Sequence, residues 1–142
     1  MNNIFKNLIR VGIVSSVNYS SGTVRVTLPD KENIVTDELP MLSFEYNMPT
    51  VGDIVLCLFL GNGLSNGFCL GKYYSENNHP LEAGENIFYK NLGGAFCKYN
   101  KTTKTLSISS ENIVLEGNLR INGNLKVDGN ITATGTITGS NI

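Results

Sequence analysis

Hydrophobic and polar positions alternate along the first half of the chain. Residues 11–19 and 23–28 both follow a period of two and are separated by Ser20, Ser21 and Gly22, a pattern that predicts a β-hairpin. A second pair of strands is predicted at 54–60 and 68–74, on either side of a glycine-rich loop. The run 54–60 is apolar almost throughout, which is typical of a strand covered on both faces.

The number and spacing of these runs predict the fold class and the domain organisation. Five or so strands in residues 11–75, with no helical period between most of them, favour a small all-β barrel of the oligonucleotide/oligosaccharide-binding (OB) topology. Residues 1–10 carry apolar side chains at helical spacing, which predicts a short N-terminal helix or docking arm. The polar stretch 76–92 is assigned to a linker. A β-rich pattern resumes over 87–109 and leads into the tail. Residues 93–142 are assigned to a spike domain.

Glycine returns at every sixth position of this tail, at Gly117, Gly123, Gly129 and Gly135. Between successive glycines lie two apolar residues two positions apart, which a short strand places on one face while polar neighbours point the other way. Asn or Asp before a glycine is typical of turns with positive φ. The repeat predicts short strands joined at glycine corners, a β-helix or β-prism. Its inward stripe is Ile113, Leu115, Leu119, Ile121, Leu125, Val127, Ile131, Ala133 and Ile137.

One copy of this tail does not account for its own stability. Ordering each residue costs on the order of 1.5 kcal/mol, and burying the stripe of a single chain returns less than that sum. Self-coiling, as in left-handed hexapeptide repeats, would complete too few turns, because such stacks need roughly three repeats. Three chains wound around one axis let every hexad face a shared core, so we expect an intertwined homotrimer.

Charge and composition narrow the function classes. The chain has 11 Lys and Arg against 12 Asp and Glu, so no basic face for nucleic acid is predicted. The N-terminus lacks the layout of a signal peptide, and no apolar run approaches the ~18 residues of a membrane span. We therefore expect synthesis in the host cytoplasm. Cys57, Cys69 and Cys97 are odd in number and predict reduced core thiols rather than a disulfide framework.

No catalytic, cofactor or metal site is predicted. The loop 61–67 lacks the lysine of a phosphate-binding loop. His79 is the single histidine, it lies in the polar linker, and the cysteines lack zinc spacing. The remaining candidates are scattered loop acids and aromatic side chains without a basic groove, for which solvated charge and core or interface packing are favoured: Asp30, Asp37, Glu38, Glu45, Phe44, Tyr46, Tyr73 and Tyr74.

Several motifs resemble those of the phage baseplate assembly protein V family, the small central spikes of contractile tails and related injection systems. The most specific are Arg10-Val11-Gly12, Leu39-Pro40, the Pro49-x-x-Gly52-Asp53 turn, Leu70-Gly71 and the glycine-punctuated tail. The resemblance covers the chain from about residue 10. It implies an N-terminal OB domain, a C-terminal trimeric β-helix and a place at the tip of the tail tube, with the tail hub and other baseplate proteins as partners.

One feature of some family members is missing from this sequence. Some members hold an iron ion at the apex through a His-x-His pair. The tail of this sequence has no histidine, so that metal site is not carried over. The tip is expected either to close on apolar residues such as Ile137 and Ile142 or to be covered by a tip-capping protein.

Together these observations favour a structural, non-enzymatic central spike. It would dock on the tail hub through its OB domain and pierce the target cell envelope with its trimeric β-helix, in a virion or in a tail-like particle such as a phage-derived bacteriocin. The alternative is a receptor- or glycan-binding tail module that uses the loops of the OB domain. A hexapeptide-repeat acyltransferase is disfavoured, because the repeat is too short and no catalytic histidine lies in or beside it.

Overall fold

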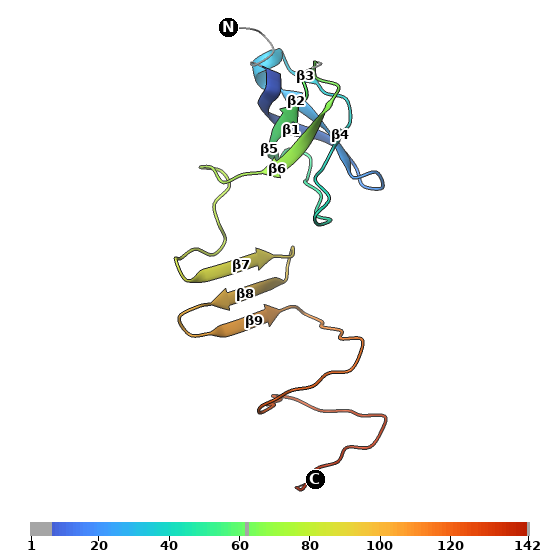
Figure 1. Ribbon diagram of the computed structural model, residues 1–142, viewed down its shortest axis with the longest axis vertical. Helices are drawn as coiled ribbons and strands as arrows, with labels where there is room; N and C mark the ends of the chain where they lie inside the picture. The colour runs from blue at the N-terminus through green and yellow to red at the C-terminus, as the bar shows by residue number, and fades with distance from the viewer. Residues whose placement is uncertain (1–6, 62, 142) are drawn as a thin grey trace. The chain divides into compact units, whose positions relative to one another are not determined.

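The computed structural model describes residues 7–61 and 63–141, and within them the chain is all-β with almost no helix. Its contacts divide it into two compact units, Met1–Gly84 and Glu85–Ile142. The described residues form a six-stranded sheet in the first unit and a three-stranded sheet in the second, and their named strands pair antiparallel (Figure 1). The all-β prediction is confirmed.

The six strands of the first unit belong to one sheet, and the longest connection between them, residues 41–53, joins β4 to β5. Along the sheet their order is β3-β2-β1-β5-β6, and β4 pairs with β2. Met41, just after β4, makes a parallel bridge to Cys69 in β6. The hydrogen-bonded path therefore leaves β4, passes through β2, β1, β5 and β6, and returns to the residue after β4. The elements are β1 Ile9–Asn18, β2 Thr23–Leu28, the 3-10 turn η1 Pro29–Lys31, β3 Ile34–Val35, β4 Leu39–Pro40, β5 Ile54–Phe59 and β6 Gly67–Lys72.

The first hairpin forms where the alternation predicted it. β1 and β2 pair from Ile13 opposite Thr27 to Asn18 opposite Thr23. Gly22 closes the turn with φ 70°, and its N–H donates to the Asn18 carbonyl at 3.0 Å. A positive φ is available to glycine without steric cost, which explains the residue at this corner.

The predicted N-terminal helix or docking arm falls largely outside the described residues. Residues 7 and 8 are helical, and β1 begins at Ile9, earlier than the alternation predicted. The rest of the predicted arm, residues 1–6, is not among the residues that the structure describes. β1 starts earlier because residues 9–13 pair with 54–58 of β5.

A compact apolar core fills the first unit. Its largest fully buried side chains are Phe59, Leu28 and Leu39, and Thr36 is buried with them. The Thr36 hydroxyl accepts from Val26 N at 3.1 Å and donates to the Asp37 carbonyl at 2.8 Å, so this buried polar group is satisfied. The core consists of Val14, Val24, Val26, Leu28, Leu39, Val55, Cys57, Phe59 and Cys69.

Only one face of β5 is covered by its own chain. Val55, Cys57 and Phe59 are buried, whereas Ile54 and Leu58 on the opposite face are exposed. The prediction of a strand covered on both faces is therefore wrong for a single chain. The run is uninterrupted because the outward positions of β5 also carry apolar side chains, which are exposed in the single chain.

The second unit contains a meander of three strands, β7 Ile87–Asn91, β8 Phe96–Asn100 and β9 Thr105–Ser109, which lie side by side in Figure 1. β7 begins at Ile87, where the β-rich pattern over 87–109 predicted it, although the domain assignment placed residues 76–92 in a linker. The rings of Tyr89 in β7 and Phe96 in β8 pack 5.5 Å apart, which gives this strand a packed partner.

Candidate functional site

Gly12, in the first of the family-like motifs, lies where no side chain fits. It is buried in β1, and a Cβ atom at this position would overlap Val26 Cγ1 and stand 2.7 Å from the Thr27 carbonyl oxygen. The motif therefore marks a close approach of β1 to β2. Leu39, from the second motif, is fully buried in β4. Gly71, from the fourth, has φ 105° beside a β-bulge opposite Leu56.

The Pro49-to-Asp53 segment is the turn that the sequence predicted, and hydrogen bonds hold it to β1. Thr50 N donates to Asp53 Oδ2 at 2.8 Å, and Asp53 N donates back to the Thr50 carbonyl at 3.0 Å. Gly52 has φ 97°. Its N–H donates to the Val14 carbonyl at 2.9 Å, and Val14 N donates to the Asp53 carbonyl at 2.9 Å. The turn thus feeds β5 directly into the register of β1.

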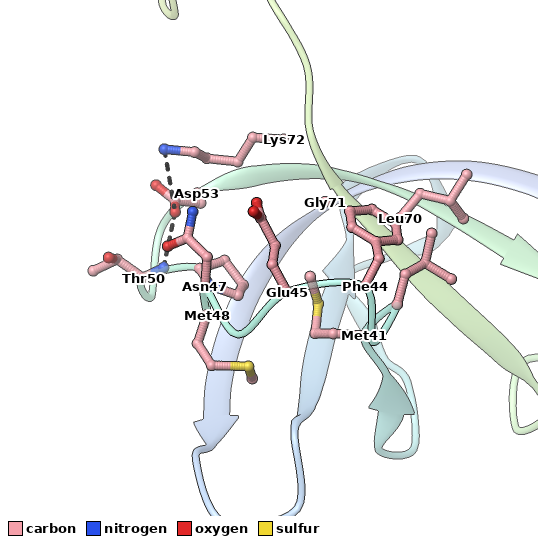
Figure 2. A pocket seen from close by; sticks show the side chains of 12 residues that line it. Met41, Phe44, Glu45, Asn47, Met48, Thr50, Asp53, Leu70, Gly71 and Lys72 are labelled. Carbon is pink, nitrogen blue, oxygen red and sulfur yellow. Dashed lines mark hydrogen bonds and ion pairs between the residues drawn. The ribbon is translucent and has the colours of Figure 1, made fainter. Parts of the chain in front are cut away.

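An open pocket of about 380 Å³ lies beside this turn (Figure 2). Lys72 Nζ stands 3.9 Å from Asp53 Oδ2 at one side of it, and Phe44 and Leu70 contribute apolar surface. Glu45 also lines it. The pocket therefore combines an exposed aromatic ring, carboxylates and an amine, groups suited to binding a polar ligand. Within the described residues no three or more His, Cys, Asp or Glu gather as a metal site.

Most of the predicted loop candidates lie apart from this pocket. Of the eight acids and aromatics named from the sequence, Phe44 and Glu45 line it. Asp30 instead pairs with Arg10, and Glu38 accepts a hydrogen bond from Asn18 Nδ2 at 3.3 Å. The Tyr46 hydroxyl donates to the Tyr19 carbonyl at 3.1 Å. These acids thus serve local contacts, and His79 is exposed in its loop.

The cysteines are free thiols in two different surroundings. Cys57 and Cys69 are fully buried and lie directly opposite each other on β5 and β6, as the prediction of core thiols requires. The pKa of the Cys57 thiol is raised, first by the hydrogen bond that it shares with the Cys69 side chain and then by burial. Both effects keep the thiol protonated and unreactive. Cys97 is half-buried on β8.

The tail bends at its glycines. No residue of 110–141 belongs to a strand, and the backbone bends at 117, 122–123, 128–129 and 134–135. Gly117 and Gly123 have φ of 134° and 148°, which favours glycine because it has no Cβ. Gly129 and Gly135 bend without such a φ, so the expectation of a positive-φ turn fails at Gly129. The corners share a period but not one backbone geometry.

The apolar stripe of the tail is exposed in the single chain, and its exposure repeats with the hexad. The first apolar residue of successive hexads is 68%, 68% and 65% exposed at Leu119, Leu125 and Ile131. The second is 48% and 44% exposed at Ile121 and Val127. Equivalent positions from Leu119 to Ile131 thus have similar exposure, whereas Ile113 at 56%, Leu115 at 70% and Ile137 at 52% depart from this pattern at the two ends of the stripe.

The polar positions between these residues carry their own contacts. Lys126 Nζ lies 3.1 Å from Asp128 Oδ1, and both side chains are highly exposed. These residues lie two apart on either side of Val127, so they share the face opposite to it. The alternation predicted from the sequence therefore separates an apolar side from a charged side.

Sequence reasoning missed a second apolar surface, on the first unit. Outward positions of β1, β5 and β6 carry large apolar side chains that are 36–64% exposed. The signal was the run 54–60, which contains no polar residue on either face. We call this surface the outer apolar face: Ile9, Val11, Ile13, Ile54, Leu58 and Phe68.

Comparison with known proteins finds one informative similarity. No protein-family model matches the sequence. The chain is 29% identical over 111 residues to the spike protein of Escherichia phage P2, an alignment that covers 73% of this chain and 51% of that protein. The chain thus spans about half the length of the curated relative that it matches. None of the described residues forms a helix long and apolar enough to cross a membrane.

Proposed function

We propose that the chain is the non-enzymatic central spike at the tip of a contractile tail baseplate, in a virion or a tail-like particle. Three copies intertwine residues 93–142 into a β-helical needle. The observation that carries the proposal is the exposed apolar stripe, which recurs every six residues and has no cover within the described chain. Apolar surface at such regular spacing requires partners with the same spacing, and identical chains provide them.

The first unit takes the role of an OB barrel in this proposal. The return of the hydrogen-bonded path from β6 to Met41 supports that topology, because an OB barrel closes in the same way through a five-strand Greek key. Through this unit the spike docks on the tail hub. The similarity to the P2 spike protein supports the assignment to a tail.

The proposed mechanism is mechanical. A prism of three chains satisfies its backbone hydrogen bonds between neighbours and leaves no open sheet edge along its length. Its apolar side chains fill the axis, and its Lys, Asp, Thr and Asn side chains face water. Such a rod can transmit axial force into the target cell envelope without local unfolding. No cofactor or metal enters the proposal.

The native mass tests this proposal directly. Size-exclusion chromatography with light scattering on the full chain should give three times the chain mass of 15.4 kDa. A deletion that ends at Ser110 should lose that association. A monomeric full chain would overturn the proposal, and a self-coiled tail would then be the arrangement to consider.

The pocket of Figure 2 favours a second candidate, a receptor- or glycan-binding tail module. Phe44, which is 82% exposed, together with Glu45 and Asp53, offers the apolar platform and the acceptors that sugars bind. Glycan-array binding that Phe44→Ala abolishes would support this role. Absence of binding on the arrays would leave the mechanical role.

A further inference from the structure

Two of the cysteines face each other across neighbouring strands. Cys57 of β5 lies directly opposite Cys69 of β6 in the antiparallel register, and both side chains are fully buried in the core. Their thiols share a hydrogen bond, so the two sulfur atoms are already neighbours. Directly opposed residues of an antiparallel pair have Cα atoms about 4.5–5.5 Å apart, and a disulfide spans Cα distances of about 4.4–6.8 Å. The register therefore places the pair where a disulfide fits without a shift of either strand.

The two thiols are chemically unequal. The hydrogen bond from Cys57 lowers the pKa of Cys69, and a backbone hydrogen bond from Gly71 also lowers it, against the effect of burial. The pKa of Cys57 is raised, first by the hydrogen bond that it shares with Cys69. The thiolate is the reactive form of cysteine. Cys69 is therefore the nucleophile of the pair, and Cys57 is the partner that keeps its proton until the second step.

Cys69 lies on a strand that few neighbours hold in the sheet. β6 ends the main path of the sheet and pairs with β5 along one side. On its other side, within the described part of the chain, it has one bridge, between Met41 and Cys69. Segments with few partners and exposed backbone groups open locally at a lower free energy than the whole unit unfolds. Such opening gives a small oxidant access to Cys69.

We propose that Cys57 and Cys69 form a site of reversible oxidation, at which hydrogen peroxide closes an intramolecular disulfide that fastens β6 to β5. The Cys69 thiolate attacks the peroxide and breaks its O–O bond. The sulfur keeps one hydroxyl as a sulfenic acid, and the other hydroxyl leaves as water with the proton of the thiol. Cys57 Sγ then attacks Cys69 Sγ, and the Cys57 proton leaves with the sulfenic hydroxyl as a second water. One peroxide is thus reduced to two waters, and two thiols are oxidised to one disulfide.

The disulfide would lock a unit that has already folded. It closes the loop between β5 and β6, which restricts the unfolded chain and stabilises the folded one. The chemistry does not depend on the proposed trimer. Its biological consequence does rest on the proposed function: in a tail particle the pair would stay reduced during assembly in the cytoplasm and would close after release into an oxidising environment.

Thiol trapping and mass spectrometry on the full chain test the proposal. The Cys97→Ser chain lacks the half-buried third thiol. The folded protein is treated with hydrogen peroxide, unfolded and alkylated. We expect neither cysteine to be alkylated, and both to be alkylated when dithiothreitol is added before alkylation. The melting temperature of the oxidised chain should fall by about 5 °C or more on reduction. Dithiothreitol does not restore oxidised methionines, so this reversible part belongs to the disulfide.

The matched control moves one thiol to the outer face of the same strand. Phe68→Cys with Cys69→Ala, in the Cys97→Ser background, keeps two thiols and places them on opposite faces of the sheet, because neighbouring residues of a strand point to opposite sides. This variant should form no intramolecular disulfide in the folded state. The melting temperature of the reduced variant shows that it is folded under the conditions of the assay.

The outcomes separate this inference from the proposed function. A reversible disulfide in the Cys97→Ser chain and none in the control supports it. Thiols that stay alkylatable in the folded chain overturn it, and so do a product that stops at a sulfinic acid, an equal yield in the control, or a disulfide that leaves the melting temperature unchanged. Light scattering on the same samples gives the native mass. A monomer with the disulfide overturns the proposed function alone, and a trimer without it overturns this inference alone.

Discussion

Arg10 Nη1 lies 2.6 Å from Asp30 Oδ2, and this ion pair joins the start of β1 to the turn after β2. The Arg10 side chain is only 14% exposed, and its Nη2 also donates to Asn7 Oδ1 at 2.8 Å. The pair therefore holds a largely buried cation in place. An exposed pair of this kind would contribute little, but removing the partner of a desolvated charge is costly.

We expect Asp30→Asn to lower the free energy of unfolding by about 1–2 kcal/mol, because the guanidinium loses its counter-ion while Asp30 itself is partly exposed. For a unit of this size, that corresponds to a fall in melting temperature of several °C. Asp37→Asn is the control, since Asp37 is exposed and has no described ion pair. Equal melting temperatures for the two variants would contradict the role of the pair.

Gly12→Ala should destabilise the first unit by about 1–3 kcal/mol, because the added methyl group overlaps Val26 and approaches the Thr27 carbonyl oxygen. Urea denaturation followed by circular dichroism measures the change. Ser16→Ala, at an exposed position of the same strand, should stay within about 0.5 kcal/mol of the wild type. If the urea midpoint of Gly12→Ala equals that of the wild type, the prediction is wrong, and β1 can move away from β2 to accommodate the methyl group.

Stability should fall at alkaline pH through Cys57. Its pKa is raised in the folded chain, whereas an unfolded thiol titrates near about 8.5. Above that pH an unfolded Cys57 releases a proton that the folded chain keeps, so this thiol lowers the free energy of unfolding by up to about 1.4 kcal/mol per pH unit. The pKa of its partner Cys69 is lowered by the hydrogen bond from Cys57 and acts in the opposite direction, so the net slope lies below that bound. Below the pKa of the unfolded thiol, Cys57 is protonated in both states, and its contribution to the free energy of unfolding is fully present. Denaturation between pH 7 and 10 should show this slope in the wild type and in Cys97→Ser, and a smaller slope in Cys57→Ser.

Leu125→Asp should abolish the trimer. In the proposed needle it places three carboxylates on one axis, where burial of unpaired charge costs several kcal/mol. Lys126→Asp changes the neighbouring residue, which is exposed and paired with Asp128, and should leave the trimer intact. Light scattering on the two variants gives the answer. A trimer in both would remove Leu125 from the inward stripe.

Much of the fold could be predicted from local pattern. The β1–β2 hairpin, the turn at Gly52 and the core thiols depend on alternation and on residues with special backbone preferences, and these signals are local. The contact between Arg10 and Asp30 could not be predicted, because it depends on how the sheet folds between two residues that lie twenty positions apart in the sequence.

The two apolar surfaces also differ in whether the sequence predicts them. The tail stripe is visible in the sequence because its period is short and strict. The outer apolar face was misread, since a strand buried on both sides and a strand buried on one side and exposed on the other have the same composition. Only the exposure of Ile54 and Leu58 in the folded chain distinguishes them.

The hexad has a consequence for how such a tail can evolve. Because equivalent positions from Leu119 to Ile131 have nearly equal exposure, removal or duplication of six residues returns every later side chain to the same orientation. In the proposed needle, a change that is not a multiple of six would move the apolar side chains and the glycine corners out of phase beyond the cut. Length can therefore vary in whole steps of one hexad, and recombination at the glycine corners would produce longer or shorter tails without new packing having to arise.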